Sequence, residues 1–257
     1  MKVTASTLYK KISKYDRFAS SEVIQKAFNI SKKAHANQFR SSGEEYFTHP
    51  LAVADLLIDM KLDSSTIITA LLHDVVEDSE ITLENIKNEF GEEISKLVDG
   101  VTKLSRLDIR FGFAQAENFR KLLLASSDDI RVLLVKLADR LHNIRTINGI
   151  KNDQKRSRIC YETLEIFAPL AERLGINAIQ KELEDRCFAE LKPETRDSIL
   201  KRLKLIYSQD ESNIPFITKE LESFLKNNKI NCLITGRVKS SYSIWKKMQF
   251  KNLSMDQ

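Results

Sequence analysis

Along most of the first 190 residues, apolar positions recur every three or four residues, the spacing of helices that bury one face. Residues that break helices are sparse, because the 257-residue chain contains only 7 Gly and 4 Pro. This scarcity argues against many short strands and tight turns. We therefore expect a mostly helical protein. The predicted helices are Ser21–Gln38, Pro50–Lys61, Ser64–Glu77, Thr82–Phe90, Glu92–Thr102, Ala114–Ala125, Asp128–Ile147, Asp153–Phe167 and Asn177–Leu191.

The pattern changes beyond Pro193. Two long helices rich in Lys and Glu are predicted there, at Glu194–Gln209 and Pro215–Lys226. The segment Ile230–Gly236 then reads as a strand and Ser240–Met248 as a helix, which together resemble the start of an α/β unit. The expected fold class is an all-α helical bundle followed by a short, incomplete α/β segment.

One connection within the helical part lacks a clear period. It covers Lys103–Phe113 and contains Arg106 and Arg110. A loop of this length inside a compact helical domain is more often functional than idle. From these limits we expect a domain at residues 1–192, a helical linker at 193–228 and the start of another domain at 229–257.

Composition indicates an ordinary globular protein, with 42% hydrophobic and 30% charged residues. No apolar run approaches the roughly 18 residues that a membrane-spanning helix needs, and no signal peptide is recognisable, so we expect a cytoplasmic protein. The net charge, 41 − 36 = +5, is spread along the chain and does not point to nucleic acid. The cysteines, Cys160, Cys187 and Cys232, are most simply small core residues in a reducing compartment.

The segment Ile67–Asp78 is the most informative for chemistry. It is an apolar helix that runs into four side chains capable of metal binding or acid–base work. His73 and Glu77 are one helical turn apart, and so are Asp74 and Asp78. This spacing predicts nitrogen and oxygen ligands at the end of a buried helix.

A second predicted helix carries a carboxylate deep in an apolar pattern. Asp139 lies there with Lys136, Asn143 and Thr146 on the same side at helical spacing. An isolated carboxylate is costly to bury, so Asp139 requires a cation.

A third helix opens at His49, which supplies another nitrogen. Two imidazoles and two carboxylates with room for water suit a hard-to-borderline divalent ion such as Mn²⁺. Such an ion promotes hydrolysis of phosphoesters and phosphoanhydrides. Glu77 and Asp78 follow these ligands by one turn, where they can orient or deprotonate the attacking water. The candidate ligands are His49, His73, Asp74 and Asp139.

Each of these residues also has a purely structural interpretation. His49 precedes a proline and suits a helix start, and Asp139 beside Arg140 suits a surface ion pair. His35 and His142 are most simply partly buried histidines with satisfied hydrogen bonds. What favours the functional interpretation is the ordered combination of H-P, H-D-x-x-E-D and L-A-D-R-x-H-N on predicted helices.

These motifs resemble the signature of the HD phosphohydrolase superfamily, and longer stretches closely resemble the hydrolase domain of the Rel/SpoT alarmone enzymes. The resemblance covers essentially residues 20–250. The stretches that carry it are Ala34–Pro50, Leu71–Asp78, Leu97–Leu104, Ala116–Lys121, Val135–Thr146, Ala168–Gly175 and Gly236–Ile244.

The resemblance implies an all-α HD domain with Mn²⁺-dependent removal of the 3′-pyrophosphate from (p)ppGpp. By position, His49, His73, Asp74 and Asp139 match the family's metal ligands, and Glu77 with Asp78 match its catalytic acidic pair. The implied substrate-binding residues are Arg40, which packs on the guanine base, Ser41, Asn143 and Thr146. Lys136 and Arg140 lie near Asp139 and either face phosphate or form structural ion pairs.

The chain departs from the family pattern at a few positions. Ser41 stands where some members have Lys, and Glu45 replaces a usual Pro in the loop beside Arg40. Gly236–Met248 resembles the opening of the family's synthetase domain, with Ser240 in place of a usual His. Because the chain stops there, we expect no alarmone synthesis by this chain and no ribosome-sensing modules.

We therefore expect a small-molecule partner, the nucleotide ppGpp or pppGpp, and neither membrane nor direct nucleic-acid binding. Two alternatives remain open at this point. One is a catalytically silent alarmone-binding or regulatory remnant, and the other is an HD phosphohydrolase that acts on another nucleotide.

Overall fold

The computed structural model describes residues 3–106, 129–210, 213–236 and 238–254. It divides into two compact units, residues 1–183 (unit 1) and 184–257 (unit 2). No strand occurs among the described residues, where the only β-type pairing is an isolated bridge between Phe39 and Glu45. The predicted all-α fold is confirmed for this part of the chain.

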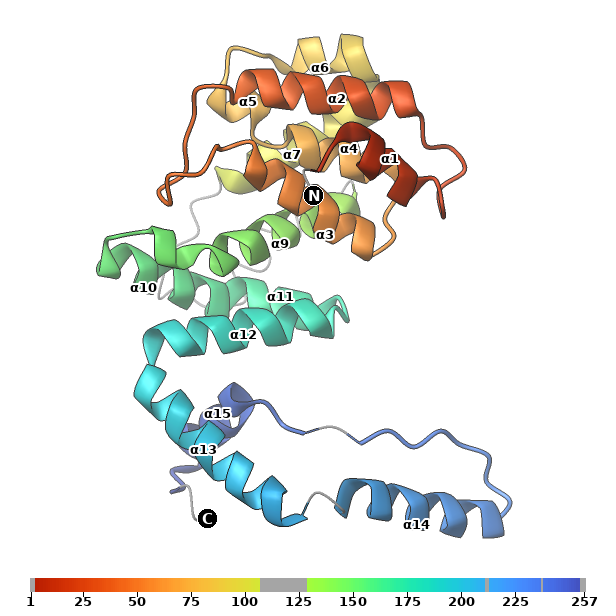
Figure 1. Ribbon diagram of the computed structural model, residues 1–257, viewed down its shortest axis with the longest axis vertical. Helices are drawn as coiled ribbons and strands as arrows, with labels where there is room; N and C mark the ends of the chain where they lie inside the picture. Colours follow the sequence, from red (N-terminus) through yellow and green to blue (C-terminus); the bar gives the residue numbers. More distant parts are fainter. Residues whose placement is uncertain (1–2, 107–128, 211–212, 237, 255–257) are drawn as a thin grey trace. The chain divides into compact units, whose positions relative to one another are not determined.

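Unit 1 is a bundle of mostly short helices (Figure 1). They are α1 (Ala5–Ile12), α2 (Ser21–Ala34), α3 (Thr48–Asp59), α4 (Ser64–Leu72), α5 (Val75–Asp78), α6 (Leu83–Phe90), α7 (Glu92–Ser105), α9 (Ile130–Arg145), η1 (Ile147–Gly149), α10 (Asp153–Glu162), the π-helical turn η2 (Thr163–Phe167), α11 (Ala168–Arg173) and the first part of α12 (Asn177–Leu191).

Helix α4 lies at the centre of the core. Every residue from Thr66 to Leu72 is buried, and the helix packs against α2, α3, α7 and α9. A helix that is apolar all round has no face that favours water, so it takes the interior position. Asp63 begins this helix by accepting a hydrogen bond from the backbone N–H of Thr66 at 2.7 Å. The C-terminal end of α4 therefore lies in the interior of the domain.

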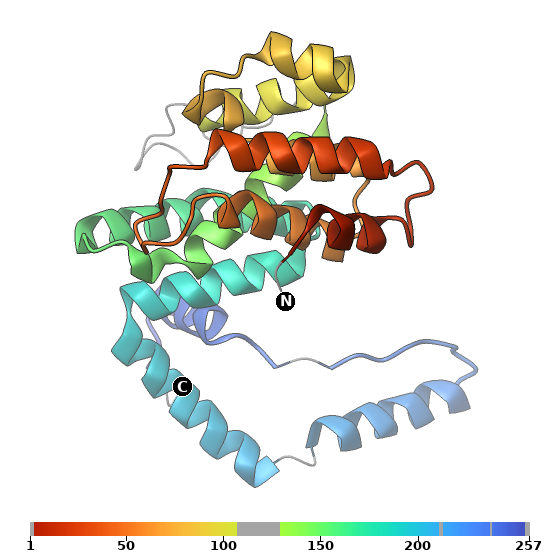
Figure 2. The same cartoon turned by 45° about the horizontal axis from the view of Figure 1, so that its top comes forward.

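Helices α3 and α9 pack side by side against this central helix, as Figures 1 and 2 both show. Asp129 caps the start of α9 through its side chain. Gly100 of α7 allows close packing on α9, because a Cβ at this position would lie 2.8 Å from Val132 Cγ2. The three helices that carry the candidate ligands thus meet within one core.

The predicted helix limits differ from the structure in two informative places. The helix predicted over Ser64–Glu77 is interrupted at His73 and Asp74, which separate α4 from α5. The predicted loop Lys103–Phe113 begins too early, because Lys103–Ser105 continues α7, and its remainder from residue 107 lies outside the described residues. The helix predicted at Ala114–Ala125 also lies outside them.

Unit 2 contains the end of α12, then α13 (Pro193–Asp210), α14 (Asn213–Asn227) and α15 (Ser241–Lys251). Its interior is a small aromatic cluster, in which the ring of Phe188 lies 5.6 Å from Tyr242 and 5.3 Å from Trp245. An ion pair at 2.8 Å joins Arg196 to Asp185. Aromatic packing and the Arg196–Asp185 ion pair both contribute to the stability of this unit.

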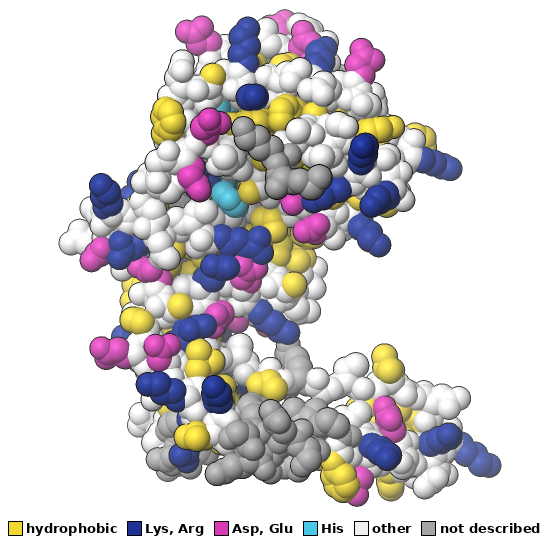
Figure 3. Space-filling model, viewed as in Figure 1, with side chains coloured by type: hydrophobic (Ala, Val, Ile, Leu, Met, Phe, Trp, Pro, Cys, Tyr) yellow, Lys and Arg dark blue, Asp and Glu magenta, His cyan; other side chains and the backbone are white. Residues whose placement is uncertain are grey.

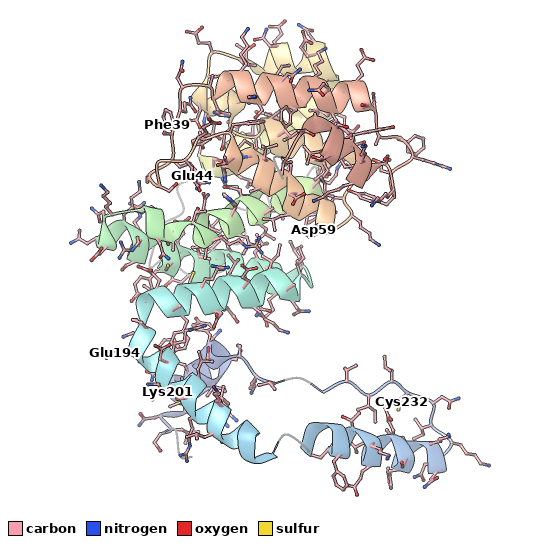
Figure 4. All side chains as sticks on the ribbon, viewed as in Figure 1. Phe39, Glu44, Asp59, Glu194, Lys201 and Cys232 are labelled. Atoms are coloured by element: carbon pink, nitrogen blue, oxygen red, sulfur yellow. The ribbon has the colours of Figure 1, made fainter. Side chains whose placement is uncertain are left out.

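The strand predicted at Ile230–Gly236 is not formed, and the segment is irregular. A strand requires a neighbour to pair its backbone groups, and none of the described residues offers one. The prediction that all three cysteines are core residues is wrong for Cys232, which is exposed in this segment (Figure 4), whereas Cys160 and Cys187 are buried. The three predicted domains remain a prediction.

Among the described residues, no helix combines the length and apolar character that crossing a membrane requires.

Candidate metal centre

The four predicted ligands come together in unit 1 from three helices. His49 lies in the first turn of α3, His73 and Asp74 follow α4 directly, and Asp139 lies in the middle of α9. His49 Nε2 is 3.2 Å from Asp139 Oδ1 and 3.7 Å from Asp74 Oδ2. His73 Nε2 is 3.1 Å from the same Asp74 oxygen. Residues separated by up to 90 positions therefore share one small polar pocket.

The interruption after α4 places two of these ligands. His73 and Asp74 form a turn between the two helices, in which Asp74 has φ −97° and ψ −8°. The carbonyl of Asp74 nevertheless accepts hydrogen bonds from the N–H groups of Glu77 at 3.1 Å and Asp78 at 2.9 Å, and these start α5. At this turn the side chains of His73 and Asp74 approach each other, with His73 Nε2 3.1 Å from Asp74 Oδ2.

His73 has the features of a metal ligand. Its Nδ1 donates to the carbonyl of Ala70 at 2.8 Å, which fixes the ring and leaves Nε2 facing the cluster. The side chain is 1% exposed, and Nε2 is a buried polar atom with no hydrogen-bond partner among the described residues. An unsatisfied buried nitrogen is costly, and a cation at this point would satisfy it. The donor set, two imidazoles and two carboxylates, fits a divalent ion.

Asp139 is a buried carboxylate with both oxygens engaged. Lys136 donates to Oδ2 at 2.7 Å, and Asn143 donates to Oδ1 at 2.6 Å. Burial alone would raise the pKa of Asp139, but the Lys136 ammonium and the neighbouring imidazoles outweigh it and hold the pKa well below its ordinary value. Asp139 is therefore ionised. The sequence analysis predicted that a buried Asp139 needs a cation beside it, and Lys136 supplies one positive charge.

Asp74 receives a hydrogen bond from the hydroxyl of Tyr46 at 2.9 Å. Burial would raise the pKa of Asp74, but His73 beside it outweighs burial and lowers it. The reverse effect raises the pKa of His73, although burial opposes this. With Asp74 and Asp139 both ionised and Lys136 paired with Asp139, the cluster favours the binding of additional positive charge.

His142 also belongs to this cluster, although the sequence analysis interpreted it only as a partly buried structural histidine. Its Nδ1 lies 2.8 Å from His49 Nδ1 and 3.0 Å from Arg40 Nη1. Burial, together with the nearby His49 and Arg40, lowers the pKa of His142 to about 3, so it is neutral. Tyr46 was likewise not predicted as a site residue. The spacing of His142 three positions after Asp139 was the available signal for it.

The acidic pair lies next to the ligands in α5. Glu77 and Asp78 are both solvent-accessible. Desolvation by surrounding protein atoms raises the pKa of Glu77, although Ser105 and Lys136 oppose this. The side-chain amide of Gln38 donates to the carbonyl of Asp78 at 2.7 Å. The pair is thus held at the edge of the pocket, where water has access.

The predicted substrate residues divide into two groups. Arg40 Nη2 donates to Asn143 Oδ1 at 2.8 Å, so Arg40 and Asn143 belong to the same network as the ligands. Ser41 is exposed beside Arg40. Thr146 Oγ1 donates to the carbonyl of His142 at 3.0 Å and thus is engaged by its own helix. Of the four, Arg40 and Asn143 are the two that contact one another.

Lys136 and Arg140, for which two interpretations stood open, both form ion pairs in the structure. Lys136 is paired with Asp139, as described above. Arg140 Nη2 lies 2.7 Å from Glu162 Oε1, and its guanidinium lies 4.1 Å from the ring centroid of Phe167. Arg140 therefore joins α9 to α10 and η2.

Arg40 is carried by a hairpin-like loop at one end of α3 (Figure 4, where Phe39 and Glu44 are labelled). The N–H of Arg40 donates to the carbonyl of Glu44 at 2.9 Å, and Gly43 turns the chain at φ +88°. Gly149 lies against this loop, because a Cβ there would be 2.9 Å from Ser42 Cβ. The exposed ring of Phe39 extends from the same loop.

The fold and the His–Asp cluster define an HD-type helical domain with a divalent-metal site. A sequence model of the HD domain matches residues 27–177, and the chain belongs to this family. The chain is 43% identical over 251 residues to "GTP pyrophosphokinase rsh" of Brucella ovis, an alignment that covers 97% of this chain and 33% of that protein. It is 46% identical over 229 residues to "Bifunctional (p)ppGpp synthase/hydrolase SpoT" of Escherichia coli K12, covering 89% of this chain and 32% of that one.

Among solved structures, one reported as "A metazoan ortholog of SpoT hydrolyzes ppGpp and plays a role in starvation responses" superimposes with a TM-score of 0.51 at 22% identity. The match covers 68% of this chain and 98% of that one, and at this identity it shows the shared fold. The similarity to Rel/SpoT proteins expected from the motifs is confirmed. The chain spans about a third of the length of the curated relatives it matches.

Proposed function

We propose that this chain hydrolyses the 3′-pyrophosphate of (p)ppGpp in the cytoplasm, with Mn²⁺ as its cofactor, to give GDP or GTP and pyrophosphate. The observation that carries the proposal is the buried cluster of His49, His73, Asp74 and Asp139, in which both imidazole Nε2 atoms face carboxylate oxygens at 3.1–3.2 Å. The relatives named above support the choice of substrate, since one of them is a (p)ppGpp synthase/hydrolase.

The four ligand residues would hold the ion, with Tyr46 and Lys136 behind Asp74 and Asp139. The bound ion supplies Lewis-acid charge that polarises a phosphoryl oxygen and makes water a better nucleophile at neutral pH. A cluster with two ionised carboxylates and one lysine favours a divalent over a monovalent ion. Mn²⁺ suits the mixed nitrogen and oxygen donors.

Glu77 and Asp78 orient and deprotonate the attacking water. Their position at the accessible edge of the pocket allows water to reach them, and the raised pKa of Glu77 makes it a better proton acceptor than an ordinary carboxylate. The water oxygen attacks the phosphorus bonded to the ribose 3′ oxygen. The bond from phosphorus to that oxygen breaks, pyrophosphate leaves, and the 3′ oxygen takes up a proton.

Arg40 packs on the guanine base. Its in-plane N–H groups bind His142 and Asn143, and this leaves the flat face of the guanidinium for stacking on a planar ring. Ser41 lies next to it on the same loop, and Asn143 and Thr146 lie on α9 where the ribose and phosphates would pass. The site thus recognises a purine nucleotide that carries phosphates near the ion.

Incubation of the purified chain with ppGpp and MnCl₂ tests the proposal, with GDP and pyrophosphate measured by ion-exchange chromatography. EDTA and Asp74→Ala should each abolish product formation. Asp59→Ala is the matched control, because this exposed aspartate lies at the other end of α3 (Figure 4) and should leave turnover unchanged. Parallel reactions with Mg²⁺, Ca²⁺ and Zn²⁺ test the choice of Mn²⁺.

Nucleotide binding without turnover under any divalent ion would overturn the proposal in favour of a silent alarmone-binding module. Turnover of a different nucleotide or cyclic dinucleotide, with ppGpp untouched, would overturn the substrate and retain the reaction type.

A further inference from the structure

His142 lies between His49, a candidate metal ligand, and Arg40 of the predicted substrate loop. Its Nδ1 is close to two groups from distant parts of the chain, at 2.8 Å from His49 Nδ1 and 3.0 Å from Arg40 Nη1. The rings of His49 and His142 have centroids 4.9 Å apart. His142 is therefore the direct connection between a candidate metal ligand and the residue expected to pack on the base.

The chemistry of the three groups fixes where the protons lie. A guanidinium has donors only, so His142 Nδ1 must carry its lone pair toward Arg40. The same unprotonated nitrogen faces His49, which must then donate its Nδ1–H. A neutral imidazole that donates from Nδ1 has its lone pair on Nε2. In His49 that atom faces Asp139 Oδ1 at 3.2 Å, inside the metal pocket.

A parallel connection runs through the adjacent residue. Arg40 Nη2 donates to Asn143 Oδ1 at 2.8 Å, and Asn143 Nδ2 donates to Asp139 Oδ1 at 2.6 Å. The amide of Asn143 is oriented by this pair of contacts, since its oxygen must accept and its nitrogen must donate. One guanidinium thus orients two consecutive side chains of α9, and each of them contacts a different candidate ligand.

We propose that His142 is a positioning residue: Arg40 keeps its Nδ1 unprotonated, and this nitrogen accepts from His49 Nδ1–H, which holds the His49 Nε2 lone pair toward the ion. His142 touches neither the ion nor the substrate. The role rests on the proposed function only in its use of Arg40 as the base-packing residue; the effect on the metal centre is independent of any nucleotide. Because coupling between two sites is reciprocal, a group that engages Arg40 also alters the affinity for the ion.

A matched pair of substitutions at position 142 tests the relay. Leu and Asn have the same number of side-chain heavy atoms, but only Asn offers an oxygen acceptor, at the same number of bonds from Cα as His Nδ1. Mn²⁺ affinity is measured on the whole chain without nucleotide, from the electron paramagnetic resonance signal of free Mn²⁺. Loss of a hydrogen-bond partner behind a metal ligand typically weakens affinity about 10–100-fold, and we expect this for His142→Leu. His142→Asn should remain within about threefold of the unaltered chain, since it retains the acceptor.

A second variant tests whether Arg40 acts through His142. Arg40→Leu should weaken Mn²⁺ binding although Arg40 lies outside the ligand set. The double variant with His142→Leu should lose less than the product of the two single losses, because both changes interrupt one chain of contacts. Glu44→Gln is the control, since Glu44 lies in the same loop and its side chain contacts Ser42 and not the network. Circular dichroism shows that each variant is folded.

Equal affinity of His142→Leu and the unaltered chain would overturn the proposal, and so would equal losses in His142→Leu and His142→Asn. Failure of the unaltered chain to bind Mn²⁺ would overturn it as well. If only the proposed function is wrong, the result differs: His142→Leu still weakens Mn²⁺ binding more than His142→Asn, but the unaltered chain does not hydrolyse ppGpp.

Discussion

The two units of this protein differ in how far their helices bury apolar side chains. In unit 1 most apolar side chains of α3, α4 and α9 are buried between helices, and α4 packs against α2, α3, α7 and α9. In unit 2 α14 presents Phe216, Ile217, Leu221 and Phe224 to solvent, each at least 45% exposed, and Figure 3 shows hydrophobic side chains at the surface of this unit. An apolar pattern at helical spacing therefore predicts a helix in both units, but it stabilises a fold only where other helices cover it.

The difference also explains where the site lies. A buried polar cluster needs a rigid surrounding to hold unsatisfied and like-charged groups together, and unit 1 supplies it through close helix packing. The aromatic cluster of Phe188, Tyr242 and Trp245 gives unit 2 a smaller interior.

The largest expected contrast is between two truncations of apolar side chains. Leu57→Ala in α3 removes a fully buried side chain and should reduce the free energy of unfolding of unit 1 by about 2–5 kcal/mol. Phe224→Ala removes a side chain that is 63% exposed and should change the stability by less than about 0.5 kcal/mol. Urea unfolding followed by circular dichroism measures both.

Fluorescence of the single tryptophan, Trp245, measures the unfolding transition of unit 2 separately. If Leu57→Ala shifts the fluorescence transition as much as the circular dichroism transition, the two units unfold together. The contrast between them would then not extend to their stability.

A smaller effect is expected where packing in unit 1 is closest. Gly100→Ala places a Cβ 2.8 Å from Val132 Cγ2 and should destabilise the chain by about 1–3 kcal/mol through overpacking between α7 and α9. Val132→Ala combined with Gly100→Ala should recover part of this loss. No recovery in the double variant would show that the cost arises elsewhere than at this contact.

Close packing also reaches the substrate loop. Gly149→Ala would bring a Cβ within 3.1 Å of the backbone nitrogen of Ser42, so the loop that carries Arg40 must shift. We expect the KM for ppGpp to rise about tenfold, equivalent to about 1.4 kcal/mol, with a smaller change in kcat. Asn148→Ala, an exposed position in the same turn, is the matched control in steady-state assays. An unchanged KM would contradict the role of this contact.

The smallest effect concerns charge at the surface of unit 1. Asp129 pairs with Arg131 at 2.6 Å, and this hydrogen-bonded pair lowers the pKa of Asp129. A lowered pKa means that the stabilisation is present above the unfolded pKa of about 3.9 and is lost as the pH falls through the lower folded value. Asp129→Asn retains an acceptor at the helix cap but loses the charge, and it should cost less than about 1 kcal/mol at pH 7.

Urea unfolding at pH 7, 5 and 3 measures this dependence. The unaltered chain and Asp129→Asn should converge toward the lowest pH. A difference that stays constant over this range would show that the carboxylate charge does not cause it.

Much of the helical layout followed from local pattern. Predicted helices such as Asn177–Leu191 match the structure, because buried positions at helical spacing need only nearby residues to be recognised. The helix predicted across His73 and Asp74 was the instructive error. Its apolar period continues to Val75, while the break depends on how the backbone accommodates the cluster.

The predicted strand at Ile230–Gly236 fails for a related reason. Its β-branched residues indicate an extended segment, and the segment is indeed not helical. Pairing is a property of two segments, and no described residue supplies the second.

The sequence by itself predicted which residues form the candidate metal centre. The ordered histidines and acidic residues identified His49, His73, Asp74 and Asp139 as a group, because ligand type and motif order are properties of the chain. Only the tertiary structure decided how the residues around that group are used. Lys136 neutralises Asp139, Tyr46 binds Asp74, and His142 joins Arg40 to His49. Most of these contacts link helices and loops far apart in sequence, and no local pattern specifies which distant side chain completes a hydrogen bond.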